Sequence, residues 1–95
     1  MNKLINNKPE MLEKYMSKQY KFANELIVIK IGNNLNQKDM AELSGMDLYR
    51  YIELEMTDMS VSVEEYIQII NLIKKQIKLI KWIFYKTFNQ KYEGV

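Results

Sequence analysis

The chain has 95 residues, 47% of them apolar, which suits one compact domain and leaves no room for a second. Its net charge is only +2, and it contains neither cysteine nor histidine. The lack of cysteine excludes disulfides and thiolate metal sites, and the lack of histidine removes the commonest general base and transition-metal ligand. We therefore expect a single domain over residues 1–95 with no cofactor, no metal and no enzymatic activity.

The sequence favours a cytoplasmic location. Residues 1–8 are polar and lack the apolar core of a signal peptide. Lysines interrupt every long apolar run, so no segment approaches the roughly 18 apolar residues of a membrane span. We expect no membrane partner.

A long helix is predicted at each end of the chain. Pro9 suits the first position of a helix, and apolar side chains recur on one face over residues 9–31. One helix is predicted over this range, with a break near Tyr20 as the alternative. Ser62 and Glu65 form a capping box ahead of a second amphipathic helix, residues 62–88. That helix would span about 40 Å, which exceeds the width of a 95-residue globule. Its far end must therefore pack on the N-terminal helix, on a second subunit, or on both, and we expect a homodimer through it.

Two short helices are predicted between the long ones. Asn36 and Asp39 resemble a capping box, which predicts a helix over residues 36–44. Gly45 then allows the left-handed conformation of a tight turn, and Asp47 is placed to cap a helix over residues 48–56. Strand-like alternation is missing, so we expect an all-α protein.

Charge is distributed unevenly along the chain. Residues 1–31 carry a net charge of +3, residues 32–65 carry −6 and residues 66–95 carry +5. Five lysines of the last helix share one face, which is either a binding surface or an ordinary solvated face: Lys74, Lys75, Lys78, Lys81 and Lys86. The acidic middle segment, residues 32–65, is unfavourable for binding to nucleic acid, whose phosphates are negatively charged.

Residues 26–73 resemble the Cro/cI-repressor-like helix-turn-helix family. The family pattern has a polar cap and a glutamine opening its second helix, then an apolar-alanine pair and a turn glycine, which here are Asn36-Gln37, Met40-Ala41 and Gly45. An apolar-acidic pair, Leu54-Glu55, follows at the expected distance. The next helix carries apolar residues at all six positions of the pattern: Val63, Tyr66, Ile67, Ile69, Ile70 and Ile73. The resemblance implies a repressor-type helix-turn-helix core, here with an extended N-terminal helix and a long C-terminal helix.

The resemblance also implies a structural ion pair. The family pairs the glutamate that closes the third helix with a basic residue late in the first, and the corresponding residues here are Glu55 and Lys30. Lys30 falls on the apolar face of its helix, where a buried ammonium group needs a charge partner. Either Lys30 pairs with Glu55, or its side chain extends to solvent from the helix end.

In this family the third helix lies in the major groove of double-stranded DNA and the second lies across the backbone. The positions that the resemblance assigns to DNA contact, or that adjoin them, are Gln37, Lys38, Asp47, Leu48, Tyr49, Arg50 and Glu53. The chain departs from the family here, because base-reading surfaces normally present polar or basic side chains. This surface presents apolar and acidic ones, with Arg50 as the one cation of the third helix.

Two functions follow as hypotheses. The first is a small, dimeric, DNA-binding transcriptional regulator of phage or mobile-element type. The second is a protein-interaction module on the same scaffold, which binds and modulates a host or phage regulator. In the second hypothesis the apolar strip of the third helix docks in a partner's groove through Leu48, Tyr49, Ile52 and Met56. An exposed apolar patch at this strip favours the second hypothesis, and burial of the strip under residues 9–20 argues against it.

Overall fold

The computed structural model describes the backbone of residues 9–93 and the side chains of residues 12–89. The expectation drawn from residues 1–8 lies outside this range. The described chain contains no strand and five helices: α2 (Pro9–Tyr15), α3 (Lys18–Gly32), α4 (Gln37–Ser44), α5 (Leu48–Glu55) and α6 (Val63–Glu93). The prediction of an all-α protein is confirmed.

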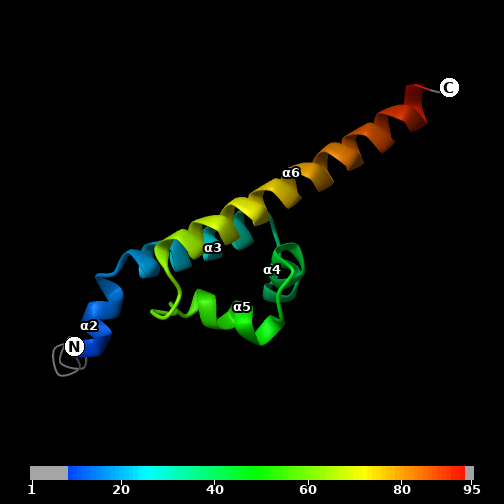
Figure 1. Ribbon diagram of the computed structural model, residues 1–95. Helices are drawn as coiled ribbons and strands as arrows, with labels where there is room; N and C mark the ends of the chain where they lie inside the picture. The colour runs from blue at the N-terminus through cyan, green and yellow to red at the C-terminus, as the bar shows by residue number, and fades with distance from the viewer. Residues whose placement is uncertain (1–8, 94–95) are drawn as a thin grey trace.

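The molecule is elongated, with extents of 67 × 26 × 20 Å. Helix α3 packs along the first half of α6, α4 packs against α6, α5 packs against α3, and α4 and α5 pack against each other (Figure 1). The second half of α6 continues beyond α3, α4 and α5 as a single projecting helix (Figure 1). This shape follows from the length of α6, because 31 residues at 1.5 Å each span about 46 Å.

The prediction of one helix over residues 9–31 is wrong. The chain bends at Met16 and Ser17, and α2 and α3 are separate helices on either side of the bend. Ser17 is the cause, because its side-chain oxygen accepts a hydrogen bond from the Tyr20 amide at 3.1 Å and so caps α3. A serine that caps a new helix competes with continuation of the old one. Tyr15 and Tyr20 pack edge to face across the bend, with ring centroids 4.9 Å apart.

The other predicted boundaries agree with the structure to within one residue, except the end of α6. Asn36 and Asp39 form the complete capping box ahead of α4, and Gly45 ends that helix with φ +67°. The Asp47 side chain caps α5, and the Ser62 hydroxyl accepts a hydrogen bond from the Glu65 amide at 3.1 Å at the start of α6. Helix α6 runs to Glu93, five residues beyond the predicted end.

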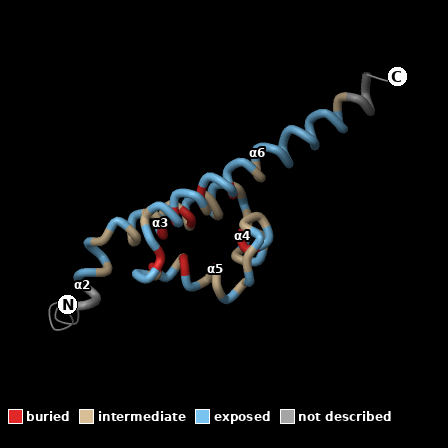
Figure 2. Tube along the Cα trace, in the orientation of Figure 1, coloured by how far each residue is buried: buried red, intermediate tan, exposed pale blue. Residues whose placement is uncertain are grey.

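One apolar core holds four helices together. Its buried members come from α3 (Ala23, Leu26), α4 (Met40, Ala41), α5 (Tyr51, Leu54), the segment before α6 (Val61) and α6 (Tyr66, Ile70, Ile73). Figure 2 shows these buried positions grouped where the four helices meet, and residues 78–89 of α6 contain none. Burial of the hydrophobic faces of four helices is the main term that stabilises this arrangement.

Candidate functional site

Helices α4 and α5 are joined by a tight turn at Gly45. The turn is closed by hydrogen bonds from the Gly45 amide to the Glu42 carbonyl and from the Met46 amide to the Ala41 carbonyl. Ala41 is buried at the crossing of the helices, where a larger side chain would push them apart. The positive φ of Gly45 is a conformation that L side chains rarely adopt, so the glycine is needed for this turn.

A buried carboxylate connects three helices behind this turn. The Lys30 ammonium group of α3 lies 2.8 Å from Glu55 Oε1 at the end of α5, and the Gln37 amide of α4 donates to the same oxygen at 3.0 Å. The Tyr51 hydroxyl donates to the other oxygen, Glu55 Oε2. The Glu55 side chain is only 5% exposed and that of Lys30 is 18% exposed. The structure therefore contains the Lys30–Glu55 ion pair, and a side chain from each of α3, α4 and α5 takes part in the network.

The network also decides which form of Glu55 is present at neutral pH. Burial by itself raises the pKa of Glu55, but hydrogen bonds from Lys30, Tyr51 and Gln37 outweigh burial and hold the pKa below its ordinary value. Burial and the adjacent carboxylate raise the pKa of Tyr51. At neutral pH, Glu55 is therefore a charged acceptor and Tyr51 a neutral donor. Their hydrogen bond holds the fold together, as does the Lys30–Glu55 ion pair.

The outward face of α5 presents two large apolar side chains. Tyr49 is 75% exposed and Met56, just after the helix, is 66% exposed, whereas Ile52 between them is half-buried. Leu48 packs against the core and contributes little to this face. Helix α2 packs against α3 and does not cover Tyr49 or Met56.

Arg50 is held between two carboxylates. Its guanidinium group donates to Asp58 Oδ2 in the loop after α5 and to Glu53 Oε2 on its own helix, the second contact at 3.2 Å. Asp47 accepts hydrogen bonds from the Tyr49 and Arg50 amides, so it acts as a helix cap. Both contacts use Arg50 Nη1, so the charge of this arginine is already paired with two carboxylates when an external anion approaches.

The loop after α5 is fixed by Asp58. The Ser60 hydroxyl and amide and the Arg50 guanidinium all donate to Asp58, and these bonds lower the pKa of Asp58 to about 2. The Asp58 amide donates to the Tyr66 hydroxyl at 3.0 Å, and that hydroxyl donates to the Leu54 carbonyl at 2.8 Å. Tyr66 therefore ties the loop and the end of α5 to α6.

The structure separates the seven residues that the sequence assigns to DNA contact into two groups. Gln37 and Leu48 turn inward, to the Glu55 network and to the core. The other five remain near the surface at the α4–α5 face: Lys38, Asp47, Tyr49, Arg50 and Glu53. Sequence reasoning missed Asp58 and Tyr51. The Asp-x-Ser spacing at Asp58 is a signal for a side-chain-stabilised turn, and Tyr51 lies four residues before Glu55, the spacing of neighbours on one helix face.

Neither a metal cluster nor a membrane-spanning helix is found in the described part of the chain. No three acidic, cysteine or histidine side chains among residues 12–89 gather where they could hold a metal ion. Within the described helices, no stretch is long and apolar enough to cross a bilayer. The exposed side chains of Tyr49 and Met56 make the α4–α5 face the candidate site.

Comparison with known proteins does not add to this picture. No protein-family model, curated protein or solved structure matches the chain.

Proposed function

We propose that this chain is a small helix-turn-helix regulator that binds double-stranded DNA through α4 and α5. The observation that carries the proposal is the Glu55 network, in which Lys30 and Gln37 fix α5 against α3 and α4 across a sharp glycine turn. A short helix pair of this kind, held rigidly and presenting its second helix outward, is the arrangement that enters a major groove. Rigid placement matters because base recognition depends on side chains held in one position.

On this proposal the start of α5 contacts base edges. Tyr49 projects from the first turn of α5, where it can pack against thymine methyl groups or stack on the sugar-phosphate backbone. Arg50 exchanges Asp58 and Glu53 for a phosphate or a guanine. Lys38 in the first turn of α4 contacts the backbone, where the amide groups at the helix start also favour an anion.

The charge of this face sets the strength of binding. Only Lys38 and Arg50 on α4 and α5 can neutralise phosphates, while Asp47, Glu53 and Asp58 repel them. With about two phosphate contacts per copy, binding of two copies to a palindromic site should show a slope of log affinity against log salt of roughly −4. That slope is shallow for a DNA-binding protein, and the affinity should be low.

The experiment begins with selection from a random double-stranded DNA library, using the purified full chain at low salt. Affinity for the enriched sequence is then measured by fluorescence anisotropy. Arg50→Ala should weaken binding by about tenfold or more and, because each of the two bound copies loses one contact, make the salt slope less negative by about two. Lys75→Gln removes the same charge from the exposed side of α6 and should leave binding unchanged.

Asp58→Asn provides the opposite test. It removes one of the two carboxylates that hold Arg50 and one negative charge from the face, so DNA affinity should rise although the fold becomes less stable. No enriched sequence, or equal loss of binding in Arg50→Ala and Lys75→Gln, would refute the proposal.

A second candidate function is favoured by the exposed strip on α5. Tyr49 and Met56 form an apolar surface beside Ile52, and the acidic groups of Asp47 and Glu53 lie on the same helix and its cap. We propose as the alternative that this strip docks in an apolar groove of another regulator whose rim is basic. Aromatic residues that stand exposed on a helix are typical anchors of such interfaces.

Nuclease treatment distinguishes the two candidates. The alternative is supported when no DNA sequence is enriched and the chain still captures a protein after nuclease treatment. The double variant Tyr49→Ser/Met56→Ser should fail to capture that protein. Val28→Ser is the matched control, since Val28 is an exposed apolar residue on α3. Loss of capture in the control as well would refute docking at α5.

A further inference from the structure

One apolar stripe on α6 continues past the part of the molecule that covers it. Along the helix it recurs at alternating intervals of four and three residues: Tyr66, Ile70, Ile73, Ile77, Ile80 and Phe84. Tyr66, Ile70 and Ile73 are buried in the core and Ile77 packs against it, but Ile80 and Phe84 are exposed, Phe84 by 72%. The same pattern is thus covered in the first half of α6 and uncovered in the second.

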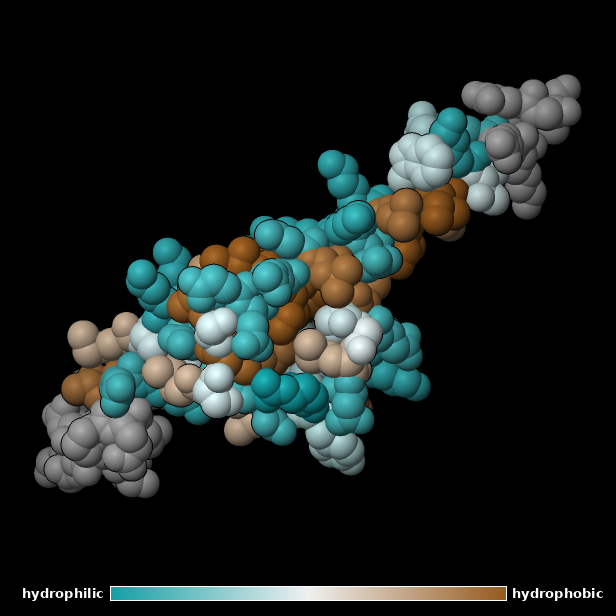
Figure 3. Space-filling model, viewed as in Figure 1, coloured by the Kyte–Doolittle hydropathy of each residue, from teal (hydrophilic) through white to brown (hydrophobic). Residues whose placement is uncertain are grey.

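The uncovered half is suited to packing against another helix. Alternation of three and four residues is the pattern by which two helices interlock over several turns. Ile83 widens the exposed stripe, and Figure 3 shows the hydrophobic surface continuing along α6 past the globular part. A helix whose apolar side is left in water needs a partner on that side.

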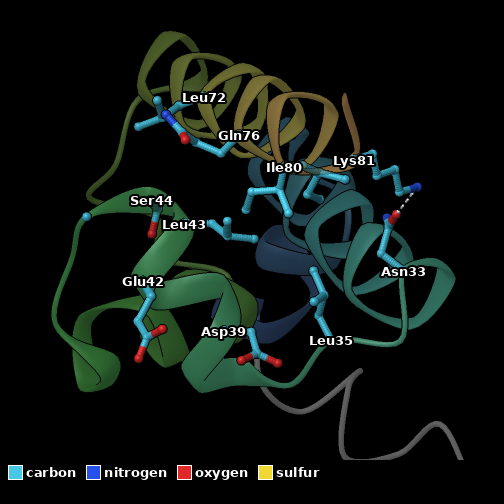
Figure 4. A pocket seen from close by; sticks show the side chains of 12 residues that line it. Asn33, Leu35, Asp39, Glu42, Leu43, Ser44, Leu72, Gln76, Ile80 and Lys81 are labelled. Atoms are coloured by element: carbon cyan, nitrogen blue, oxygen red, sulfur yellow. Dashed lines mark hydrogen bonds between the residues drawn. The ribbon is translucent and has the colours of Figure 1, made fainter. Parts of the chain in front are cut away.

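Two hollows that differ in charge lie where the covered half of the stripe ends. The larger, about 680 Å³, lies between α4 and α6, and its apolar lining includes Leu35, Leu43 and Ile80. Asp39 and Glu42 stand at its α4 edge, and Lys81 also lines it (Figure 4). The smaller, about 300 Å³, lies between α3 and α6 and is lined by Lys74, Lys78 and Lys81.

We propose that a second copy of this chain covers the stripe. Residues 79–88 of one copy lie in the α4–α6 groove of the other, antiparallel to its α6, and the exchange is reciprocal. Ile80 both lines the groove and belongs to the stripe, so groove and exposed stripe form one continuous apolar surface. This inference does not depend on what α5 binds.

Charge selects the groove over the smaller hollow. The second half of α6 contains Lys78, Lys81 and Lys86, and there is no acidic residue between Glu65 and Glu93. The groove has two carboxylates, Asp39 and Glu42, against one lysine, Lys81, whereas the hollow beside α3 is lined by three lysines and no acidic residue. A lysine-rich helix is therefore attracted to the groove and repelled by the hollow beside α3.

Geometry selects the antiparallel orientation. In each copy the globular part packs on the first half of α6 (Figure 1). In a parallel pair the two first halves lie side by side, so the globular part of each copy would overlap the α6 helix of the other. An antiparallel pair has two-fold symmetry and places the globular parts at opposite ends. Burial of Ile80, Ile83, Phe84 and the groove lining from both copies removes on the order of 1,000 Å² of surface, the lower limit for a specific interface.

The first test is the oligomeric state of the full chain by sedimentation equilibrium across the micromolar range. Phe84→Ser removes an exposed aromatic ring from the stripe. Tyr85→Ser removes a ring of similar exposure, 62%, that lies about 100° further around the helix. Wild type and Tyr85→Ser should be dimeric and Phe84→Ser should dissociate at least tenfold more readily, with unchanged helix content by circular dichroism in all three.

The second test locates the partner helix, and it is simple because the chain contains no cysteine. A Glu42→Cys chain is mixed with a Thr87→Cys chain under mild oxidation, since Thr87 lies two turns beyond Ile80 on the stripe side of α6. A disulfide-linked heterodimer should form. Tyr85→Cys, whose thiol lies about 100° around the helix from Phe84, should cross-link to Glu42→Cys far more slowly.

Each alternative outcome would overturn the proposal. A monomeric wild type would show that a second copy does not cover the stripe, and a different protein would then be its partner. If the dimers of Phe84→Ser and Tyr85→Ser dissociated equally readily, the stripe would not be part of the interface. A dimer that fails to cross-link between the Glu42→Cys and Thr87→Cys positions would place the second copy outside the groove.

Discussion

Replacement of Lys30 by methionine should destabilise the protein strongly, because it leaves a buried carboxylate without its counter-ion. Glu55 is 5% exposed and would retain only the neutral donors Gln37 and Tyr51. Loss of one partner of a buried pair costs about 3–5 kcal/mol. Since Lys30 is 18% exposed and two donors remain, we expect a loss near the lower end, about 3 kcal/mol.

Urea unfolding at pH 7, followed by circular dichroism, measures this loss. The matched control is Lys74→Met, which breaks the ion pair with Glu25 at the surface, where both side chains are more than a third exposed. The control should cost at most about 0.5 kcal/mol. In the double variant Lys30→Met/Glu55→Gln the losses should be less than additive by about 1–2 kcal/mol, since no buried charge remains.

The pH dependence gives the sign of the effect. The pKa of Glu55 is lowered in the folded wild type, so its stabilising contribution is present above the unfolded pKa, about 4.5, and is lost as the pH falls through the lower folded value. In Lys30→Met, the two remaining donors offset burial less well than the three donors of the wild type, and protonation of Glu55 relieves an uncompensated charge. The difference in unfolding free energy between wild type and Lys30→Met should therefore shrink below about pH 4.5. A loss in Lys30→Met no larger than in the Lys74 control would refute this account of the network.

Three further predictions test the α4–α5 unit. Gly45→Ala should cost about 1 kcal/mol in urea unfolding, because φ is +67° while an added Cβ meets nothing within 4 Å; a neutral result would contradict the conformational argument. Asp58→Asn should lower the free energy of unfolding by about 2 kcal/mol at pH 7. The Asp58 pKa is lowered to about 2 in the folded protein, so this carboxylate stabilises the fold above its unfolded pKa and the wild type loses that stability between about pH 4 and pH 2. The variant should lack this part of the acid-induced loss, and an unchanged acid profile would contradict the prediction. Tyr66→Phe should cost about 1–2 kcal/mol and speed hydrogen exchange at the Asp58 amide, since the lost hydroxyl both accepts from that amide and donates to Leu54; unchanged exchange would remove its role in the loop.

The middle of the chain was predictable because its signals are local. Asn36, Gly45, Asp47 and Ser62 act on backbone groups within a few residues of themselves, so their positions fix where helices begin and end. The bend at Ser17 shows where local signals conflict. Apolar periodicity favours one helix through this point, and a capping serine favours two; the structure follows the serine.

The ion pair was reached by a different route. The family resemblance placed Lys30 and Glu55 in register, and the amphipathic pattern put a lysine on an apolar face that needed a counter-ion. The remaining donors to Glu55 were not predicted, because Gln37 reaches it only when α4 and α5 are folded against each other. Gln37 and Leu48 were assigned outward roles for the same reason, and only packing showed that they turn inward.

Sequence by itself determined the helices, their caps and the side of each helix that is apolar, since these depend on neighbours along the chain. Tertiary structure decided which carboxylates hold Arg50 and which half of the α6 stripe is covered. The periodicity is the same at Ile73 and at Ile80, and only the positions of α3 and α4 against α6 distinguish the buried residue from the exposed one. Burial depends on what lies across from a helix, and that is set by contacts between residues distant in the chain.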